Sequence, residues 1–405
     1  MKTKFDSIES AILDIKQGKM IIVVDDDDRE NEGDLIMAAE KATPEQINFM
    51  AKFGRGMICA PLSEEKAHQL DLPLQVSKNN SAHGTAFTVT IDANSNISTG
   101  ISAADRAHTL NLLSSSSKAS DFVKPGHIFP LIAKNGGVLV RQGHTEAAVD
   151  LCSLSDLTPV GVICEIMNDD GTMSRLDELV EFKNKHQLKL ISITDLRKYR
   201  LQHENLISER VSIPFSHKYG EFKLTVYKSA ILNQEIIALI KENQKPHDEL
   251  PLVRLHSECF TGDIFGSYRC DCGDQLDQSM KLIEEHGHGV LLYLRQEGRG
   301  IGLFNKIKSY ALQDQGMDTV EANIHLGFKP DLREYSMASM ILKELGLTEF
   351  KLLTNNPHKL SALKELGLGK ISLHPIPLHQ HMKNYSYLLT KKLKLGHLLD
   401  DLKSH

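Results

Sequence analysis

Tryptophan is absent from this chain of 405 residues, and aromatic residues make up only 6% of it. Proteins that bind single-stranded nucleic acid stack the bases on aromatic side chains, so this composition argues against such a partner. No apolar run approaches the roughly 20 residues that span a bilayer, and residues 1–18 lack the apolar core of a signal peptide. The sequence therefore predicts a protein with no nucleic-acid partner and no membrane partner.

Cysteine is also scarce: there are six, and Cys59, Cys152 and Cys164 lie far apart. This spacing is unlike a disulfide framework and predicts a reducing, cytoplasmic location. The net charge of −6 and the isoelectric point near 6.3 argue against non-specific binding to polyanions. A chain of this length exceeds one ordinary core, so we expect two domains of about 200 residues each.

The other three cysteines crowd into the stretch CFTGDIFGSYRCDCG, residues 259–273. Zinc prefers soft thiolate ligands, and a catalytic zinc keeps three protein ligands and one open position. In an extended segment Cys270 and Cys272 would point to one side, and Gly262 and Gly266 would let Cys259 return beside them. Three free buried thiols are the alternative, but this Gly- and Asp-containing stretch is poor core material. We therefore predict a zinc site at the three cysteines.

An acidic run stands out in the first half, where DDDDRENEGD, Asp25 to Asp34, contains seven acidic residues in ten. It follows a short apolar strand expected at Met20–Val24. Ligands of α/β proteins bind in loops that leave strand ends, and carboxylate oxygens suit Mg²⁺. A solvated acidic loop is the other interpretation, and the spacing alone leaves both open.

Two histidines and one glutamate follow in the same half. His127 lies in KPGHIFP, and His144 lies in RQGHTEA, between a strand expected at Gly137–Val140 and a helix. Taken alone, each histidine is better explained as a hydrogen-bonded turn residue. Glu165 lies in the apolar run VGVICEI, where a carboxylate is costly unless it is paired, protonated or bound to metal. Glu165 is therefore the stronger indication of a site.

Capping signals and hydrophobic periodicity predict the other elements. The first half is expected to hold helices at Ser7–Lys16, from a capping box at Thr43, Pro44 and Gln46 to Gly54, and from Ser102, with strands at Gly56–Ala60, Phe87–Ile91 and Leu188–Ile191. The second half is expected to hold strands within Val211–Ser229, a helix at Leu232–Lys241, a helix at Gln275–His286 and a strand at Gly289–Leu294. Asp331 is predicted to cap a helix that reaches Gly346, and residues 390–399, TKKLKLGHLL, are typical of an ordinary amphipathic end.

A glycine-rich turn, RQEGRGIGL, residues 295–303, follows the strand expected at Gly289–Leu294. Glycines let the backbone close on a ligand, and arginine grips phosphate with two parallel hydrogen bonds. The spacing fits neither a P-loop nor a dinucleotide-binding turn. We predict a phosphate-binding turn of another kind.

These motifs, taken together and in order, resemble two enzyme families. VRLHSECFTGD, SYRCDCGDQL, YLRQEGRGIGL, LQDQGMDTVEAN and LLTNNPHK resemble GTP cyclohydrolase II, whereas DDDDRENEGDL, SAADRAHT, KPGHIFPL and GGVLVRQGHTEAAVDL resemble 3,4-dihydroxy-2-butanone 4-phosphate synthase. The resemblance covers nearly the whole chain, and the two sets of motifs together resemble the bifunctional riboflavin biosynthesis family. It implies an α/β fold of two mixed α/β domains in tandem, a synthase domain at residues 1–203 and a cyclohydrolase domain at residues 204–405. A homodimer is also expected.

For the synthase half, the resemblance implies that ribulose 5-phosphate is converted to 3,4-dihydroxy-2-butanone 4-phosphate and formate with Mg²⁺ or Mn²⁺. The cation would stabilise charge on vicinal oxygens while carboxylates move protons, and Arg141 suits the phosphate. The implied metal ligands are Glu30 and His144, and the implied catalytic residues are Asp34 and Glu165. The implied substrate contacts are Arg29, Glu30, Asp34, Arg141, Gln142, Gly143, His144, Thr145 and Glu165.

For the cyclohydrolase half, the resemblance implies hydrolysis of GTP to 2,5-diamino-6-(ribosylamino)pyrimidinone 5'-phosphate, formate and diphosphate, with Zn²⁺ on the three cysteines and Mg²⁺ on the triphosphate. The implied proton acceptor is Asp331 and the implied nucleophile is Arg333. Because a guanidinium stays protonated, electrostatic stabilisation of the departing phosphate is the easier role for Arg333. The implied GTP contacts are Arg254, Leu255, His256, Ser257, Glu258, Gln275, Glu297, Gly298, Arg299, Thr319, Thr354 and Lys359.

Two alternatives remain at this point. In one, only the synthase half turns over; in the other, the second half is a zinc-stabilised nucleotide-binding module. Intact Asp331 and Arg333 argue against the second alternative. Measuring the release of formate from each substrate would distinguish these two alternatives from an enzyme in which both halves are active.

Overall fold

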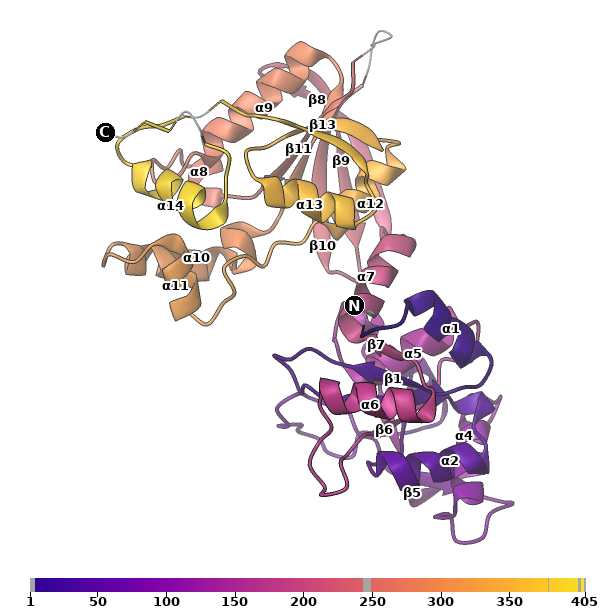
Figure 1. Cartoon of the computed structure of the whole chain (residues 1–405). Helices are drawn as coiled ribbons and strands as arrows, with labels where there is room; N and C mark the ends of the chain where they lie inside the picture. Colours follow the sequence, from indigo (N-terminus) through magenta and orange to yellow (C-terminus); the bar gives the residue numbers. More distant parts are fainter. Residues whose placement is uncertain (1–3, 243–248, 378, 400–401, 404–405) are drawn as a thin grey trace. The chain divides into compact units, whose positions relative to one another are not determined.

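The computed structural model describes residues 4–242, 249–377, 379–399 and 402–403. The chain divides into two compact units between His203 and Glu204, and each unit is built on its own sheet (Figure 1). Both sheets mix parallel and antiparallel pairs and carry helices on their faces. The predicted fold class, two mixed α/β domains in tandem, is confirmed.

The sheet of the first unit has the strand order β4-β5-β3-β6-β2-β1-β7. At its centre β2 pairs antiparallel with both β1 and β6, whereas β1 pairs parallel with β7. The strands are β1 (Ile21–Val24), β2 (Gly33–Ala38), β3 (Cys59–Leu62), β4 (Ile91–Ala93), β5 (Phe122–Ile132), β6 (Gly161–Glu165) and β7 (Leu190–Ser192).

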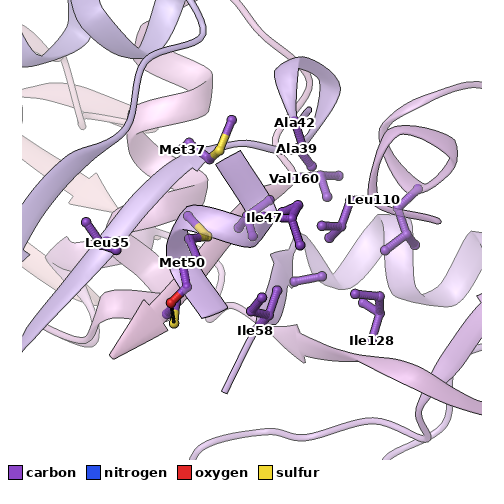
Figure 2. Close-up of a cluster of buried hydrophobic side chains, with 14 of the residues drawn as sticks. Leu35, Met37, Ala39, Ala42, Ile47, Met50, Ile58, Leu110, Ile128 and Val160 are labelled. Atoms are coloured by element: carbon purple, nitrogen blue, oxygen red, sulfur yellow. Dashed lines mark hydrogen bonds between the residues drawn. The ribbon is translucent and has the colours of Figure 1, made fainter. Parts of the chain in front are cut away.

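Helices cover both faces of this sheet. They are α1 (Ile8–Lys16), α2 (Pro44–Phe49), α3 (Glu64–Gln69), α4 (Ala103–Ser114), α5 (His144–Leu154), α6 (Leu176–His186) and α7 (Ile193–His203), with the short turns η1 (Ala39–Lys41), η2 (Met50–Gly54), η3 (Ala119–Asp121) and η4 (Gly137–Leu139). Alternate residues of β1 face opposite ways, so Ile22 joins a core cluster with α2, α4 and α6, and Ile21 joins one with α1, α5 and α7. Figure 2 shows part of the first cluster, where Ile47 and Leu110 bring α2 and α4 together.

The sheet of the second unit has the strand order β14-β13-β11-β12-β10-β9-β8. One half is parallel, from β14 through β12, and the other half is antiparallel, from β12 through β8. The strands are β8 (Glu209–His217), β9 (Gly220–Ser229), β10 (Gln234–Lys241), β11 (Leu252–Ser257), β12 (Gly289–Leu294), β13 (Glu349–Leu353) and β14 (Lys370–His374).

Two core clusters again lie on opposite faces of the sheet. Ile341 and Leu363 bring α12 and α13 onto one face, and Met280 and Ile283 bring α9 onto the other. The helices are α8 (Phe260–Asp263), α9 (Cys272–His286), α10 (Gly302–Gln313), α11 (Thr319–His325), α12 (Ser336–Glu344), α13 (Pro357–Glu365) and α14 (Tyr385–Leu395), with the turn η5 (Glu297–Gly300). Within the described residues, no helix combines the length and the apolar content that crossing a bilayer requires.

The predicted helix starts are confirmed where a capping side chain marks them. Ser7 accepts a hydrogen bond from the Ser10 amide at the start of α1, and Ser102 does the same for Asp105 at the start of α4. Thr43 and Gln46 form the predicted capping box of α2. Such caps are local in sequence, which is why the pattern alone could reveal them.

Two predicted elements are wrong. Residues 137–140 are not a strand, because Gly136 and Gly137 adopt left-handed backbone angles, with φ of 93° and 61°, and begin the turn η4. Residues 232–241 are not a helix but contain β10, which is hydrogen-bonded to β9 and β12. The apolar run IIALI suits either period, and the two flanking strands decide the outcome.

Other predictions shift as well, and the strand expected at Gly56–Ala60 lies at Cys59–Leu62. The strand expected at Phe87–Ile91 begins only at Ile91, with isolated bridges before it. Asp331 does not cap a helix, since α12 begins at Ser336 after Tyr335, and the Asp331 carboxylate binds Arg333 instead. The cysteine segment is not extended either, because Cys272 is the first residue of α9.

Candidate active sites

The acidic run forms an ordered loop between β1 and β2, organised around the buried Asp25. One oxygen of its carboxylate accepts a hydrogen bond from the Glu32 amide at 2.8 Å, and the other accepts from the Glu30 amide at 3.0 Å and from Arg29 at 2.8 Å. Arg29 also pairs with Glu30 at 2.9 Å. Residues 26–28 are exposed, so the solvated-loop interpretation describes only the middle of the run. Asp25 was missed as a site residue, although its place directly after the strand was a signal.

His144 begins α5 and is buried against this loop. Its Nδ1 lies 3.8 Å from a Glu30 oxygen and 3.8 Å from an Asp34 oxygen, and its Nε2 donates to the Val23 carbonyl at 3.1 Å. The bond to the carbonyl leaves Nδ1 free to act as a ligand, an orientation common for histidines that hold metals. Ligand atoms of Asp25, Glu30 and His144 lie within 4.8 Å of one another, and carboxylate oxygens with one imidazole fit Mg²⁺ or Mn²⁺.

Asp34 and Glu165 lie directly opposite each other on β2 and β6, although 131 positions separate them in sequence. Like charges opposite one another destabilise an antiparallel pair, so this arrangement indicates a function. Glu165 accepts a hydrogen bond from the Met57 amide at 2.8 Å, and a Cβ on Gly56 would lie 2.4 Å from the same oxygen. The glycine and the amide therefore hold the Glu165 carboxylate in place.

The ionisable groups of this site are pushed apart in pKa. Burial, with the charges of Glu165 and Glu30, raises the pKa of Asp34 to about 7. Burial would lower the pKa of His144, but Asp34 and Glu30 outweigh it and raise the pKa to about 9. The neighbouring His144, with the charge of Arg29, lowers the pKa of Glu30 to about 2. Groups separated in this way are suited to act as acid and base in one site.

The segment RQGHTEA positions its residues through Glu146, which sequence analysis missed. Arg141 donates hydrogen bonds to Glu146 at 2.6 Å and to Thr85 at 3.0 Å. The bond to Thr85 holds the segment 79–85, which lines a pocket together with Glu30. A Cβ on Gly143 would lie 2.4 Å from Arg141 Nη1 and 2.9 Å from a Glu146 oxygen, so a larger residue there would displace this ion pair. Thr145 is buried and Gln142 is exposed. An acidic residue in the buried first turn of α5 was the available signal for Glu146.

In the second unit the three predicted cysteines come together as free thiols at the starts of α8 and α9. The Sγ atoms of Cys259 and Cys270 lie 3.6 Å apart, and the three Sγ atoms lie within 4.8 Å of one another. Tetrahedral zinc at about 2.3 Å from each sulfur separates two sulfurs by about 3.8 Å, so the donor set fits zinc. Gly262 makes the fit possible, because a Cβ there would lie 2.9 Å from the Cys270 sulfur.

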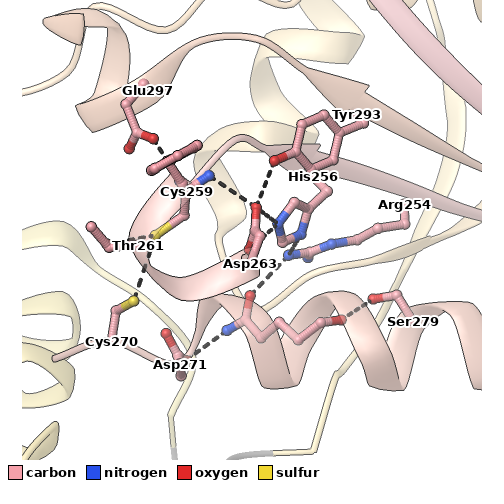
Figure 3. A network of polar contacts seen from close by, with 12 residues as sticks. Arg254, His256, Cys259, Thr261, Asp263, Cys270, Asp271, Ser279, Tyr293 and Glu297 are labelled. Atoms are coloured by element: carbon pink, nitrogen blue, oxygen red, sulfur yellow. Dashed lines mark hydrogen bonds and ion pairs between the residues drawn. The ribbon is translucent and has the colours of Figure 1, made fainter. Parts of the chain in front are cut away.

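A buried polar network holds Cys259 (Figure 3). The Asp263 carboxylate accepts hydrogen bonds from the Cys259 amide at 2.9 Å, from Tyr293 at 2.8 Å and from His256 at 3.1 Å. The Lys306 ammonium lies 3.1 Å from the Cys259 sulfur. Hydrogen bonds from the other two thiols, aided by Lys306, lower the pKa of Cys259, which favours the thiolate that a metal needs.

One cavity in this unit gathers most of the predicted GTP contacts with all three cysteines. The residues predicted as GTP contacts that line it are Arg254, His256, Ser257, Glu258, Gln275, Glu297, Gly298, Arg299, Thr319, Thr354 and Lys359. Leu255 is fully buried and lies outside the lining, and its carbonyl accepts a hydrogen bond from Lys359 at 2.7 Å.

The glycine-rich turn at the cavity has a strained backbone and carries a partly buried arginine. Gly298, Arg299 and Gly300 all adopt left-handed angles, with φ of 63°, 63° and 94°, which is uncommon for an arginine. Arg299 Nη1 is buried and makes no hydrogen bond within the described part of the chain. A buried guanidinium nitrogen facing a cavity without a partner fits an anionic ligand.

Arg333 and Asp331 form a bidentate pair near this turn. Arg333 Nε donates to one carboxylate oxygen at 2.9 Å and Nη2 donates to the other at 2.5 Å. The Leu332 amide donates to the Arg299 carbonyl at 3.0 Å, which docks the segment on the turn. Burial opposes the charge of Arg333, but Tyr335 and Asp331 outweigh it and raise the pKa, so this guanidinium stays charged.

The cavity also has walls that sequence analysis missed. Lys306 and Tyr310 come from α10, and Asn323 comes from α11. Tyr387, Lys391 and His397 come from the C-terminal segment. The interpretation of that segment as an ordinary amphipathic end was wrong, because Lys391 is buried while Leu393 is 72% exposed.

Comparisons with known proteins agree with this division of the chain. The family model of 3,4-dihydroxy-2-butanone 4-phosphate synthase matches residues 9–199, and that of GTP cyclohydrolase II matches residues 208–372. Riboflavin biosynthesis protein RibBA of Aquifex aeolicus is 54% identical over 399 residues, 98% of either chain. RibBA of Bacillus subtilis is 54% identical over 396 residues, 98% of this chain and 99% of the relative.

A solved structure is similar over both units. RibBX of A. baumannii, described as a two-domain 3,4-dihydroxy-2-butanone 4-phosphate synthase, is 36% identical, covers 91% of this chain and 99% of its own, and has a TM-score of 0.68. Fold and sites thus define an enzyme made of two α/β catalytic units. The chain belongs to the bifunctional riboflavin biosynthesis family, in which a 3,4-dihydroxy-2-butanone 4-phosphate synthase domain precedes a GTP cyclohydrolase II domain.

Proposed function

We propose that both units turn over, and that each does so at the site described in it. The unit ending at His203 converts ribulose 5-phosphate to 3,4-dihydroxy-2-butanone 4-phosphate and formate. The unit from Glu204 hydrolyses GTP with release of formate and diphosphate. One observation carries the proposal for the second unit: a single cavity joins three thiols to the arginines Arg254, Arg299 and Arg333.

In the synthase unit, Glu30 and His144 would hold Mg²⁺ or Mn²⁺ with help from the loop around Asp25. A bound divalent cation supplies a Lewis acid for charge on neighbouring substrate oxygens. Asp34 and Glu165 move protons, because the buried Asp34 keeps a pKa near neutrality beside the fixed Glu165 carboxylate. Arg29, Arg141 and Thr145 bind the phosphate and orient the substrate, with Gln142 and Gly143 at the start of α5.

In the cyclohydrolase unit, Cys259, Cys270 and Cys272 would hold Zn²⁺. A bound zinc ion supplies a Lewis acid that activates water near neutral pH. The cations from β11, the glycine-rich turn and α13 bind the triphosphate, which itself carries Mg²⁺. Asp331 accepts a proton, and its carboxylate is aligned for this by Arg333.

Arg333 acts as an electrostatic stabiliser in this proposal, not as a nucleophile. A guanidinium whose pKa is raised keeps its proton and lacks a free lone pair. Its position beside the glycine-rich turn suits negative charge that develops on a departing phosphate. All six cysteines are free, in keeping with a reducing cytoplasm, and a homodimer remains our expectation.

The experiment that tests the proposal is formate release from each substrate by one preparation of the whole chain. Both ribulose 5-phosphate and GTP should yield formate in proportion to enzyme. Formate from ribulose 5-phosphate alone would support the alternative in which only the first unit turns over. Binding of GTP without formate release would support a nucleotide-binding module.

A further inference from the structure

The C-terminal helix α14 lies beyond the segment that the cyclohydrolase family model matches, which ends at residue 372. Even so, Tyr387 and Lys391 of this helix, and His397 after it, line the same cavity as the three cysteines. Figure 1 shows α14 near α11, and the two helices are in contact. The cavity is therefore completed by a part of the chain that carries none of the family's quoted motifs.

At two positions of α14 the burial is the reverse of that expected for an ordinary amphipathic helix. Lys391 is 7% exposed, whereas Leu393 is 72% exposed. A buried ammonium is costly unless it is paired and hydrogen-bonded. The helix thus turns a charged side chain inward at this position, so this charge needs a buried partner.

Lys391 contacts the cysteine segment itself. Its Nζ donates to an Asp271 oxygen at 2.6 Å, and Asp271 is 1% exposed and lies between Cys270 and Cys272. The other Asp271 oxygen accepts from Gln275 at 2.7 Å, and the Gln275 carbonyl oxygen accepts from Arg254 at 2.8 Å. A continuous line of hydrogen bonds therefore runs from α14 through the segment with two of the thiols to β11.

Two further contacts tie α14 and its extension to other walls of the cavity. Lys394 pairs with Asp318, the N-cap of α11, and with Glu321 at 2.8 Å. The residue after Asp318 is Thr319, which lines the cavity. The Leu398 amide donates to the carbonyl of Asn355, another lining residue, at 2.8 Å.

We propose that α14 (Tyr385–Leu395) acts as a clasp, meaning that it holds one wall of the nucleotide cavity in place. Within this clasp, Lys391 is a positioning residue for the cysteines at the metal site. By fixing the Asp271 carboxylate, Lys391 fixes the backbone on which the Cys270 and Cys272 sulfurs are carried. Groups that orient metal ligands in this way typically change metal affinity or activity by about 10- to 100-fold when removed. This inference rests on the proposed zinc and GTP chemistry of the second unit.

The test compares Lys391→Met with two other variants of the whole chain. Methionine keeps the length and the apolar stem of the lysine but removes its charge. The double variant Lys391→Met with Asp271→Asn also removes the buried unpaired carboxylate, so it separates positioning from the cost of an orphan charge. Lys392→Met is the matched control, since this neighbouring lysine is half-buried and is not among the lining residues.

The readouts are retention of Zn²⁺ against a chromogenic chelator, kcat and KM for formate release from GTP, and synthase activity. We expect Lys391→Met and the double variant to lose zinc about 10- to 100-fold more readily and to lower kcat by a similar factor. Lys392→Met should match wild type, and synthase activity should be unchanged in all three variants. Zinc retention and kcat at the wild-type level in either Lys391 variant would overturn the clasp.

The wild-type chain tests the proposed function separately from the clasp. Wild type that retains Zn²⁺ and releases formate from GTP upholds the proposed function, whatever the Lys391 variants do. Wild type that does neither refutes the proposed function, and the clasp is then refuted with it.

Discussion

In the part of the chain that the structure describes, both units are built on seven-stranded mixed sheets, but they assemble their sites in different ways. In the first, Glu30, Asp34, His144 and Glu165 come from a loop, two strands and a helix that are spread along the chain. In the second, the three cysteines lie within one short segment at the starts of two helices. A site built from one segment is visible in a sequence, whereas a site built across a sheet becomes visible only when the strands are paired.

The two sites also differ in charge. Carboxylates dominate the first, where Asp25, Glu30 and Asp34 lie around the His144 imidazole and form a negatively charged place for a divalent cation. Basic side chains dominate the second, where Arg254, Arg299, Arg333 and Lys359 line one cavity. The two sites therefore suit different substrates. The first, with its carboxylates and a hard metal ion, suits a sugar monophosphate. The second, with its basic side chains and three cysteines, suits a nucleoside triphosphate.

The largest expected effect separates the two metals. Cys270→Ser replaces a soft anionic ligand by a hydroxyl that stays protonated, so zinc should be lost and formate release from GTP should fall at least about 100-fold. Metal content and formate release measured on one preparation check this. Synthase activity should persist, and Cys152→Ser, at a buried cysteine outside the site, serves as the control. Full zinc content with normal GTP turnover would show that Cys270 is not a ligand of a catalytic zinc ion.

The reciprocal change acts on the first unit. His144→Ala removes the imidazole that faces Glu30 and Asp34, so turnover of ribulose 5-phosphate should fall by about 100-fold or more while GTP turnover is kept. Steady-state formate release from each substrate measures both. His68→Ala, at an exposed histidine of α3, should behave as wild type. Near-normal synthase activity in a folded His144→Ala protein would return this histidine to the role of a turn residue.

A smaller effect is expected from the network behind Cys259. Tyr293→Phe removes the hydrogen bond to Asp263 and leaves the ring in place, so formate release from GTP should fall about 10-fold, as the loss of one hydrogen bond to a charged group implies. Tyr219→Phe is the matched control, because Tyr219 donates at 2.5 Å to Asp277, away from the cysteines. Equal kinetics for the two variants would show that Asp263 is held without Tyr293.

The smallest expected effect tests the independence of the units. A fragment ending at His203 should convert ribulose 5-phosphate with Mg²⁺ at the rate of the whole chain, since each unit has its own core. Circular dichroism confirms that the fragment is folded before its activity is measured. A folded fragment that is inert, beside an active whole chain, would mean that the first unit needs the second.

Much of the local structure could be predicted because the signals are local. The caps at Ser7, Thr43 and Ser102 act within a single helical turn, and they mark the starts of α1, α2 and α4 as expected. The helix expected at residues 232–241 failed because an apolar run without polar interruptions suits two periods. Hydrogen bonds from β9 and β12, far away in sequence, decide that it becomes β10.

The candidate sites divide along the same line. The sequence by itself determined the thiol cluster, because its three ligands lie within fourteen residues of each other, whereas for the acidic loop it left a metal site and a solvated loop both open. Only the tertiary structure decided that Glu165 faces Asp34 and that Lys391 reaches Asp271. Strand register and the docking of a terminal helix depend on packing between distant segments, and no local pattern of residues encodes such a contact.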